Sequence, residues 1–145
     1  MSIDPEDFMR AALIESRKAL PLCLPNPPVG CVFVKAGAIV ARGYTQPPGL
    51  HHAEAMAMSQ VSRDFTDVTA YVTLEPCSFQ GRTPSCAKAL VVSGIKRVIV
   101  AMLDPDPRNA GAGIQILRAG GIDVSVGLLE CEAIADLLPY LRSIS

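Results

Sequence analysis

The sequence predicts an α/β fold, a three-layer α-β-α sandwich around a five-stranded mixed sheet. The prediction rests on three features. Runs rich in β-branched residues alternate with helical runs, one run (96–102) is nearly all apolar, as in a strand covered on both faces, and 50% of the chain is apolar. The chain has 145 residues, so we expect residues 1–145 to form a single domain around one core.

The first third of the chain predicts a helix followed by a hairpin. Residues 4–20 are expected to be helical, with Asp4 as the cap and a proline and two acidic residues in the first turn. Four prolines and a glycine in PLCLPNPPVG end this helix. Residues 29–35 and 38–44 then predict two strands joined at Ala36 and Gly37.

The rest of the chain alternates helices and strands, which favours a mostly parallel sheet sandwiched by helices. One of the expected helices takes Thr83 as its cap and Pro84 in its first turn, and ends at Gly94. The predicted segments are a helix from about 52 to 63, a strand over 68–75, the helix capped by Thr83, a strand over 96–102, a helix over 114–121, a strand over 122–129 and a helix over 130–142.

Composition excludes several classes of function. The net charge is −1 with both signs interspersed, so there is no broad basic surface for nucleic acid or an acidic membrane. No apolar run approaches the roughly 20 residues that span a bilayer, and the acidic start MSIDPEDF does not resemble a signal peptide. We expect a cytoplasmic protein, in which an odd count of five cysteines indicates thiols or metal ligands rather than disulfides.

Two segments carry residues suited to a catalytic zinc site: HHAEAMAM at 51–58 and TLEPCSFQGRTPSC at 73–86. A catalytic zinc takes three protein ligands and leaves a fourth position for water. His52, Cys77 and Cys86 would supply one imidazole and two thiolates, which neutralise the Zn²⁺ charge. We expect Cys86 in the first turn of its helix, where the dipole favours a thiolate, and His52 at a helix start, where it disfavours imidazolium.

Glu54 is the candidate general acid and base. Residues two apart do not share a helix face, so Glu54 and His52 can converge only if His52 is the cap. Glu54 could then face the water instead of coordinating the metal. An ordinary first-turn glutamate is the alternative interpretation of this residue. His51 is interpreted as a loop residue.

Together these motifs resemble the cytidine-deaminase-like superfamily, whose zinc signature is His-x-Glu followed by Pro-Cys-x-x-Cys. The wider spacing between the cysteines resembles one branch, the pyrimidine deaminase of riboflavin biosynthesis (diaminohydroxyphosphoribosylaminopyrimidine deaminase). That branch has a pattern close to HAE … TLEPCSHxGRTPPC after an upstream PNPxVG, and a DPNPxxxGxG loop. This chain has PNPPVG at 25–30, HAE at 52–54 and DPDPRNAGAG at 104–113.

The resemblance implies further roles. His52, Cys77 and Cys86 match the zinc ligands, Glu54 the acid/base and Asn26 the asparagine that bonds the substrate ring. Arg82 matches a basic residue suited to a ribosyl phosphate. The family's fold is a five-stranded mixed sheet between helices, and its members form homodimers or larger homo-oligomers. Its bacterial members are often fused to a reductase, which we expect here to be a separate protein, leaving a stand-alone deaminase domain.

The chain departs from that pattern at three positions of the pocket region. Thr45 and Phe79 stand where the family usually has histidines, and Ser85 replaces a proline. We therefore predict that Thr45 and Phe79 contact a substrate that differs in detail. Phe79 could stack on a substrate ring or only fill space, Asn26 could serve turn geometry between prolines, and Arg82 could be a solvated charge.

Three functions follow in order of preference. The first is deamination of the riboflavin-pathway diaminopyrimidine ribosyl phosphate. The second is the same chemistry on another free base, nucleoside or secondary metabolite, such as cytosine or guanine. The third, from a different class, is a zinc-stabilised binding module without turnover. In each case the expected partner is a small aminated heterocycle, with no nucleic acid and no membrane.

Overall fold

The computed structural model describes residues 4–61, 64–78 and 85–141. The elements follow the predicted order of helices and strands. They are α1 (Pro5–Lys18), β1 (Gly30–Lys35), β2 (Ala38–Tyr44), α2 (Ala53–Met58), β3 (Val68–Val72), α3 (Cys86–Ser93), β4 (Arg97–Val100), α4 (Ala112–Ala119), β5 (Asp123–Val126), α5 (Glu130–Leu137) and a short 3₁₀ helix, Leu138–Tyr140.

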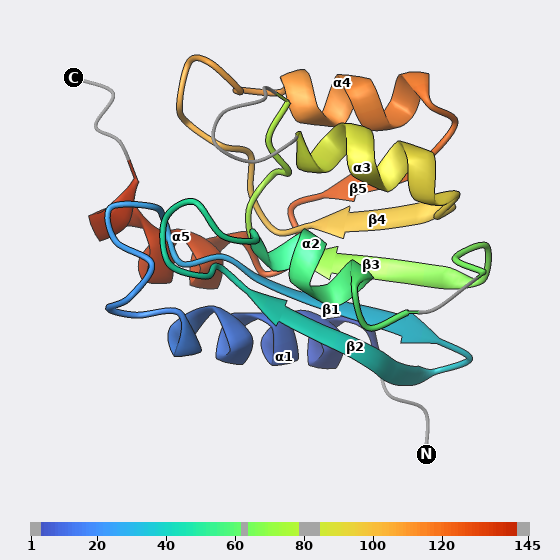
Figure 1. The fold of residues 1–145 in the computed structure, drawn as a ribbon, viewed down its shortest axis with the longest axis horizontal. Helices are drawn as coiled ribbons and strands as arrows, with labels where there is room; N and C mark the ends of the chain where they lie inside the picture. Colours follow the sequence, from blue (N-terminus) through green and yellow to red (C-terminus); the bar gives the residue numbers. More distant parts are fainter. Residues whose placement is uncertain (1–3, 62–63, 79–84, 142–145) are drawn as a thin grey trace.

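The five strands form one mixed sheet in the order β2-β1-β3-β4-β5 (Figure 1). Strand β1 runs antiparallel to both β2 and β3, whereas β3, β4 and β5 run parallel. The predicted five-stranded mixed sheet is confirmed. Four strands, β2, β3, β4 and β5, run in the same direction, and only β1, which the hairpin inserts between β2 and β3, runs opposite to them.

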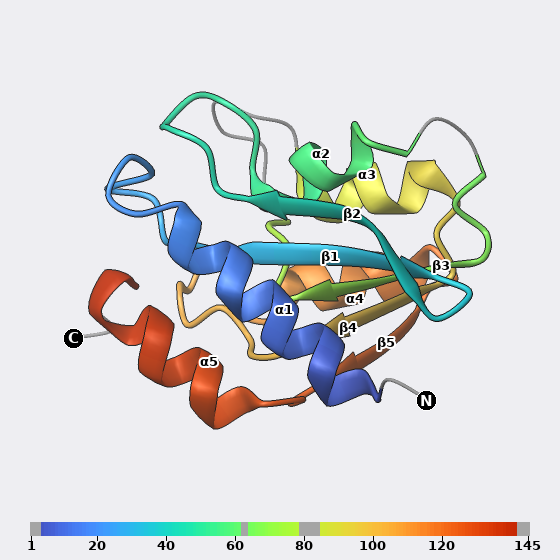
Figure 2. The ribbon, with the colours of Figure 1, turned by 90° about the horizontal axis from the view of Figure 1, so that it is seen from below.

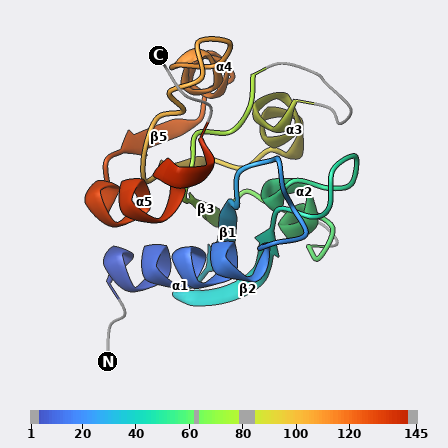
Figure 3. The same cartoon turned by 90° about the vertical axis from the view of Figure 1, so that its left-hand side faces the viewer.

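Helices cover both faces of the sheet. Helices α1 and α5 lie on one face (Figure 2), and α2, α3 and α4 lie on the other (Figure 3). Successive residues of β1 alternate between the two cores, with Phe33 buried on the α2–α4 side and Val32 and Val34 on the α1–α5 side. The alternation places apolar side chains in both layers, which explains why β1 is apolar and buried along most of its length.

Local signals fix several ends of these elements. Asp4 caps α1 in a reciprocal box, accepting from the Asp7 N–H at 3.2 Å while Asp7 accepts from the Asp4 N–H at 3.3 Å. Gly94 ends α3 in a left-handed conformation, as predicted. Strands β3, β4 and β5 are shorter than expected because apolar residues beyond their ends, such as Leu74 and Met102, are buried in loops instead of sheet.

A close contact between β2 and α2 sets the position of the helix that begins after His52. A Cβ on Gly43 would lie 2.1 Å from the carbonyl oxygen of Ala53, so only glycine allows this approach. Helix α2 therefore lies directly against the sheet. Within the described part of the chain, no helix combines the length and apolar character needed to cross a bilayer.

Candidate active site

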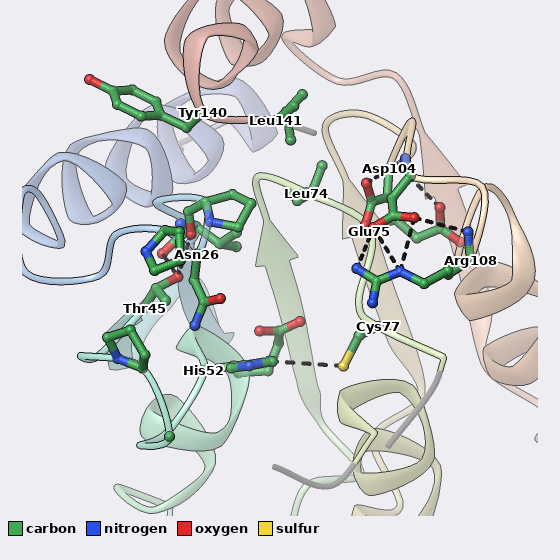
Figure 4. Close-up of a pocket in the computed structure, with 17 residues that line it drawn as sticks. Asn26, Thr45, His52, Leu74, Glu75, Cys77, Asp104, Arg108, Tyr140 and Leu141 are labelled. Carbon is green, nitrogen blue, oxygen red and sulfur yellow. Dashed lines mark hydrogen bonds and ion pairs between the residues drawn. The ribbon is translucent and has the colours of Figure 1, made fainter. Parts of the chain in front are cut away.

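Three side chains from separate segments converge at one end of the sheet. His52 precedes α2, Cys77 follows β3 and Cys86 begins α3. One ligand atom from each lies within 4.8 Å of the other two. His52 Nδ1 is 3.8 Å from Cys77 Sγ (Figure 4) and 3.4 Å from Cys86 Sγ.

His52 is the N-cap of α2, in an extended conformation (φ −73°, ψ 171°), and its side chain makes no capping hydrogen bond. The imidazole instead lies next to the sulfur atoms of Cys77 and Cys86. Glu54 lies in the first turn and is buried, with 4% of its surface exposed. The placement of His52 at the cap is the arrangement that allows the two side chains to face the same pocket.

The two cysteines are tied together through the backbone. The Cys86 N–H donates to Cys77 Sγ at 3.2 Å, and the Ala87 N–H donates to the Cys77 carbonyl at 3.1 Å. Ser85 is the N-cap of α3, and its hydroxyl donates to the same carbonyl at 2.9 Å. The predicted cap Thr83 and first-turn Pro84 lie outside the described residues, and the described helix takes Ser85 as its cap.

The spacing of these atoms fits a tetrahedral metal. Zinc bonds of about 2.3 Å to sulfur and about 2.05 Å to nitrogen, at tetrahedral angles, place sulfur and nitrogen about 3.6 Å apart. The two measured separations, 3.4 and 3.8 Å, bracket that value. One nitrogen and two sulfur donors form a set that zinc accepts while keeping a fourth position open.

The ionisation of the cluster in the metal-free protein differs from our expectation. A hydrogen bond from Cys86, with others from His52 and the Cys86 N–H, lowers the pKa of Cys77 to about 4. The hydrogen bond to Cys77 and burial raise the pKa of Cys86 well above its usual value. The hydrogen bond between the two cysteines thus shifts their pKa values in opposite directions, because a second thiolate beside the first is disfavoured.

In the metal-free protein the pKa of His52 is raised rather than lowered. The hydrogen bond to Cys77 raises it, and this effect exceeds the opposing effect of burial. Burial, followed by the nearby charge of Cys77, raises the pKa of Glu54 to about 7. A buried carboxyl group with a raised pKa beside such a cluster is suited to accepting and returning a proton near neutral pH.

The cluster opens into a cavity of about 670 Å³, lined in part by His52, Glu54 and Cys77. Figure 4 shows Asn26 and Thr45 on one side of this pocket and Asp104 and Arg108 on the other, with His52 and Cys77 between them. The volume suits a small molecule. Five of the sequence-predicted site residues therefore line one pocket: Asn26, Thr45, His52, Glu54 and Cys77.

Thr45 is buried and its hydroxyl is already used. It donates to the Pro27 carbonyl at 3.0 Å and accepts from the Val29 N–H at 3.0 Å, while the Thr45 N–H donates to the Val29 carbonyl at 3.0 Å. Thr45 thus fixes the loop that carries Asn26. Direct contact of this residue with substrate stays a prediction. Phe79 and Arg82, the other predicted pocket residues, lie outside the described residues.

Sequence reasoning assigned no role to the opposite wall, which consists of the loop after β4. Asp104 and Arg108 line the pocket, and Asp106 holds the Arg108 guanidinium with contacts of 2.6–3.2 Å. Glu75, also in the lining, is buried and accepts hydrogen bonds from three backbone N–H groups of this loop and of α4. The DPDPRNAGAG motif was the available signal for this wall.

Comparison with known proteins identifies the family of this chain. The family described as the cytidine and deoxycytidylate deaminase zinc-binding region matches residues 2–102. The chain belongs to this deaminase family. The matched region includes the three candidate ligands and Glu54, and ends at the start of the loop that forms the opposite wall.

Relatives of this deaminase-family chain include riboflavin biosynthesis proteins. The RibD proteins of Aquifex aeolicus and Escherichia coli are each 48% identical to it over 128 residues, which is 88% of this chain and 36% and 35% of theirs. The structure of Acinetobacter baumannii RibD, form 2, superposes with a TM-score of 0.90 at 42% identity, covering 94% of this chain and 38% of that one. The chain thus spans roughly a third of the length of these riboflavin biosynthesis relatives, and its fold is that of the cytidine deaminases.

Proposed function

We propose that this chain is a zinc-dependent hydrolytic deaminase of a small aminated nitrogen heterocycle. The observation that carries the proposal is the convergence of His52, Cys77 and Cys86, at a cavity that His52, Cys77 and the buried Glu54 line. The family's description as a zinc-binding region supports the choice of metal. The net reaction would take up one water, release ammonia and leave a ring carbonyl where the amine stood.

His52, Cys77 and Cys86 would hold the zinc, which when bound supplies Lewis acidity next to the reacting carbon. Glu54 would accept a proton from the attacking water at its carboxylate. The protonated carboxyl group would then pass that proton to a ring nitrogen, and a later proton to the departing amine. Burial of Glu54 limits the access of bulk water to these transfers.

The preferred substrate is the riboflavin-pathway diaminopyrimidine ribosyl phosphate. Support comes from the identities of 40–48% to riboflavin biosynthesis proteins. We assign the Asn26 amide to hydrogen bonding with the substrate ring, and Arg82 to the phosphate. Replacing Arg82 with Ala should raise KM for the phosphorylated substrate by about tenfold or more, because a charge-assisted hydrogen bond contributes about 1.5–3 kcal/mol. An unchanged KM would remove Arg82 from the phosphate site.

A second substrate class is favoured by one observation. Thr45 stands where the resemblance expects a histidine, and its hydroxyl already bonds two backbone groups of the Asn26 loop. The pocket wall therefore offers less hydrogen bonding to substrate at this position. Another free base or nucleoside, such as cytosine or guanine, is the alternative substrate.

The decisive experiment combines a variant with a panel assay. Glu54→Gln should keep one zinc per chain and lose ammonia release by about 100-fold or more, since general acid–base catalysis contributes that much. Ammonia release should be measured with the riboflavin-pathway pyrimidine, cytosine, guanine and their nucleosides. Wild-type turnover by the Gln variant would refute the role of Glu54. Zinc binding without turnover on any compound would favour the binding module.

The cytoplasmic location and the homo-oligomeric state stay predictions. Light scattering of the purified protein in solution measures the latter directly, with a dimer or larger assembly expected.

A further inference from the structure

We propose that Asn109 is a positioning residue that holds the backbone on both sides of Cys77 and thereby sets the geometry of the metal centre. The inference rests on the proposed zinc site. Asn109 falls at an open position of the DPNPxxxGxG pattern, and it does not line the pocket. It would act only through Cys77.

The Asn109 side chain bonds to the residues on either side of Cys77. Its Oδ1 accepts from the Ser78 N–H at 3.1 Å, and its Nδ2 donates to the Pro76 carbonyl at 3.2 Å. These are the backbone groups immediately before and after Cys77. A single amide side chain therefore satisfies one donor and one acceptor of a loop that has no sheet partner at this point.

Asn109 is itself held in place. Only 2% of its surface is exposed, its own N–H donates to the Asp106 carbonyl at 2.9 Å, and its carbonyl accepts from the Ala112 N–H at 2.6 Å. Its Nδ2 also lies 3.5 Å from Asp104 Oδ2. Both ends of the residue are thus fixed, so the amide is a rigid support rather than an adaptable surface contact.

The hydrogen bonds of Asn109 add to those that Cys77 itself makes with the start of α3. Helix α3 holds the Cys77 carbonyl and sulfur through Ser85, Cys86 and Ala87. Asn109 holds the Pro76 carbonyl and the Ser78 N–H from the opposite loop. Without the amide, the Cys77 loop would keep its α3 contacts but lose those that fix it to the pocket wall. Groups that orient metal ligands in this way usually contribute 10- to 100-fold to metal affinity.

Two variants separate the parts of this contact. Asn109→Leu removes both hydrogen bonds at similar volume. Asn109→Asp keeps the acceptor for Ser78 but places an oxygen against the Pro76 carbonyl. The matched control is Ser16→Ala, which removes a buried hydroxyl that donates to the Leu13 carbonyl in α1, away from the pocket.

The measurements are the zinc dissociation constant by competition with a chromophoric chelator, the visible spectrum of the Co²⁺-loaded protein, and the thermal midpoint of the metal-free protein. We expect zinc to bind about 10- to 100-fold more weakly to both variants, with an altered thiolate-to-cobalt absorption, and wild-type values for Ser16→Ala. A merely structural role would lower the metal-free midpoint and leave the cobalt spectrum unchanged, which overturns the proposal.

The outcomes distinguish the inference from the proposed function. Wild-type protein that binds no zinc contradicts the proposed function itself. Wild-type protein that binds zinc and releases ammonia, with both Asn109 variants within twofold of its zinc affinity, contradicts only the role of Asn109. If Asn109→Leu does not fold, Asn109→Asp alone decides by the same twofold criterion.

Discussion

Replacing Glu75 with Gln tests whether one buried carboxylate holds the pocket wall in place. Glu75 Oε1 accepts from the N–H groups of Asp104 and Gly111, each at 3.0 Å, and Oε2 accepts from the Ile114 N–H at 3.1 Å. Only 3% of Glu75 is exposed. A glutamine can present one oxygen to two of these donors but must then direct its NH₂ group at the third.

The magnitude follows from that count. At least one charge-assisted bond is lost and a buried Ile114 N–H is left facing another donor, which costs about 2–3 kcal/mol. For a domain of this size each kcal/mol shifts the thermal midpoint by about 2–4 °C, so the midpoint should fall by about 4–12 °C. Glu75→Ala loses all three bonds and should cost about 4–5 kcal/mol, less than the sum because two of the donors can reach water.

The assay is urea unfolding of the metal-free protein at pH 7, followed by circular dichroism. Glu132→Gln, an exposed glutamate 3.9 Å from Arg10, is the control and should change the free energy of unfolding by less than about 0.5 kcal/mol. If Glu75→Gln is as stable as that control, the three hydrogen bonds do not hold the loop, and the reasoning is wrong.

Three further predictions concern the metal, helix α2 and Asp104. Protein at a free zinc concentration one hundred times the zinc dissociation constant should be more stable than chelated protein by about 2.7 kcal/mol in the free energy of unfolding. An unchanged midpoint in calorimetry after chelation would contradict a bound metal. Gly43→Ala should push α2 away from the sheet, which should lower stability by about 1–3 kcal/mol and turnover by about 100-fold. Gly37→Ala is the control: Gly37 has open space around it but a φ of +76°, so this variant should lower stability and leave turnover unchanged. Burial raises the pKa of Asp104, so the folded state binds this proton more tightly than the unfolded state. The stability of the wild type relative to Asp104→Asn should then fall as pH rises from about 3.9 through the raised pKa, and a difference that stays flat across this interval would refute the assignment.

Local sequence signals predicted much of the fold. The Ala36–Gly37 turn takes positive φ at both positions, as the short hairpin connection requires, and Gly94 ends α3 in the left-handed region. The metal cluster was also predictable, because His52, Cys77 and Cys86 lie in short motifs whose residue types carry the chemistry.

The remaining features depend on contacts between distant parts of the chain. Glu75 bonds to Gly111, 36 residues away, and Asn109 to Ser78, 31 residues away, and neither pair has a periodicity that marks it. The pKa of Cys86 in the metal-free protein depends on distant contacts in the same way: the helix start is a local feature, but the hydrogen bond to Cys77 that raises this pKa comes from another segment.

The bonds of Glu75 also restrict how this chain can vary. Surface connections usually tolerate inserted residues at little cost. Here the Glu75 carboxylate accepts hydrogen bonds from the backbone N–H groups of Asp104 and Ile114, the two ends of one stretch of chain. Adding or deleting a residue between them would break at least one of these hydrogen bonds. Substrate preference at this wall of the pocket can therefore change by substitution of side chains, such as those of Asp106 and Arg108, while the length of the loop stays the same.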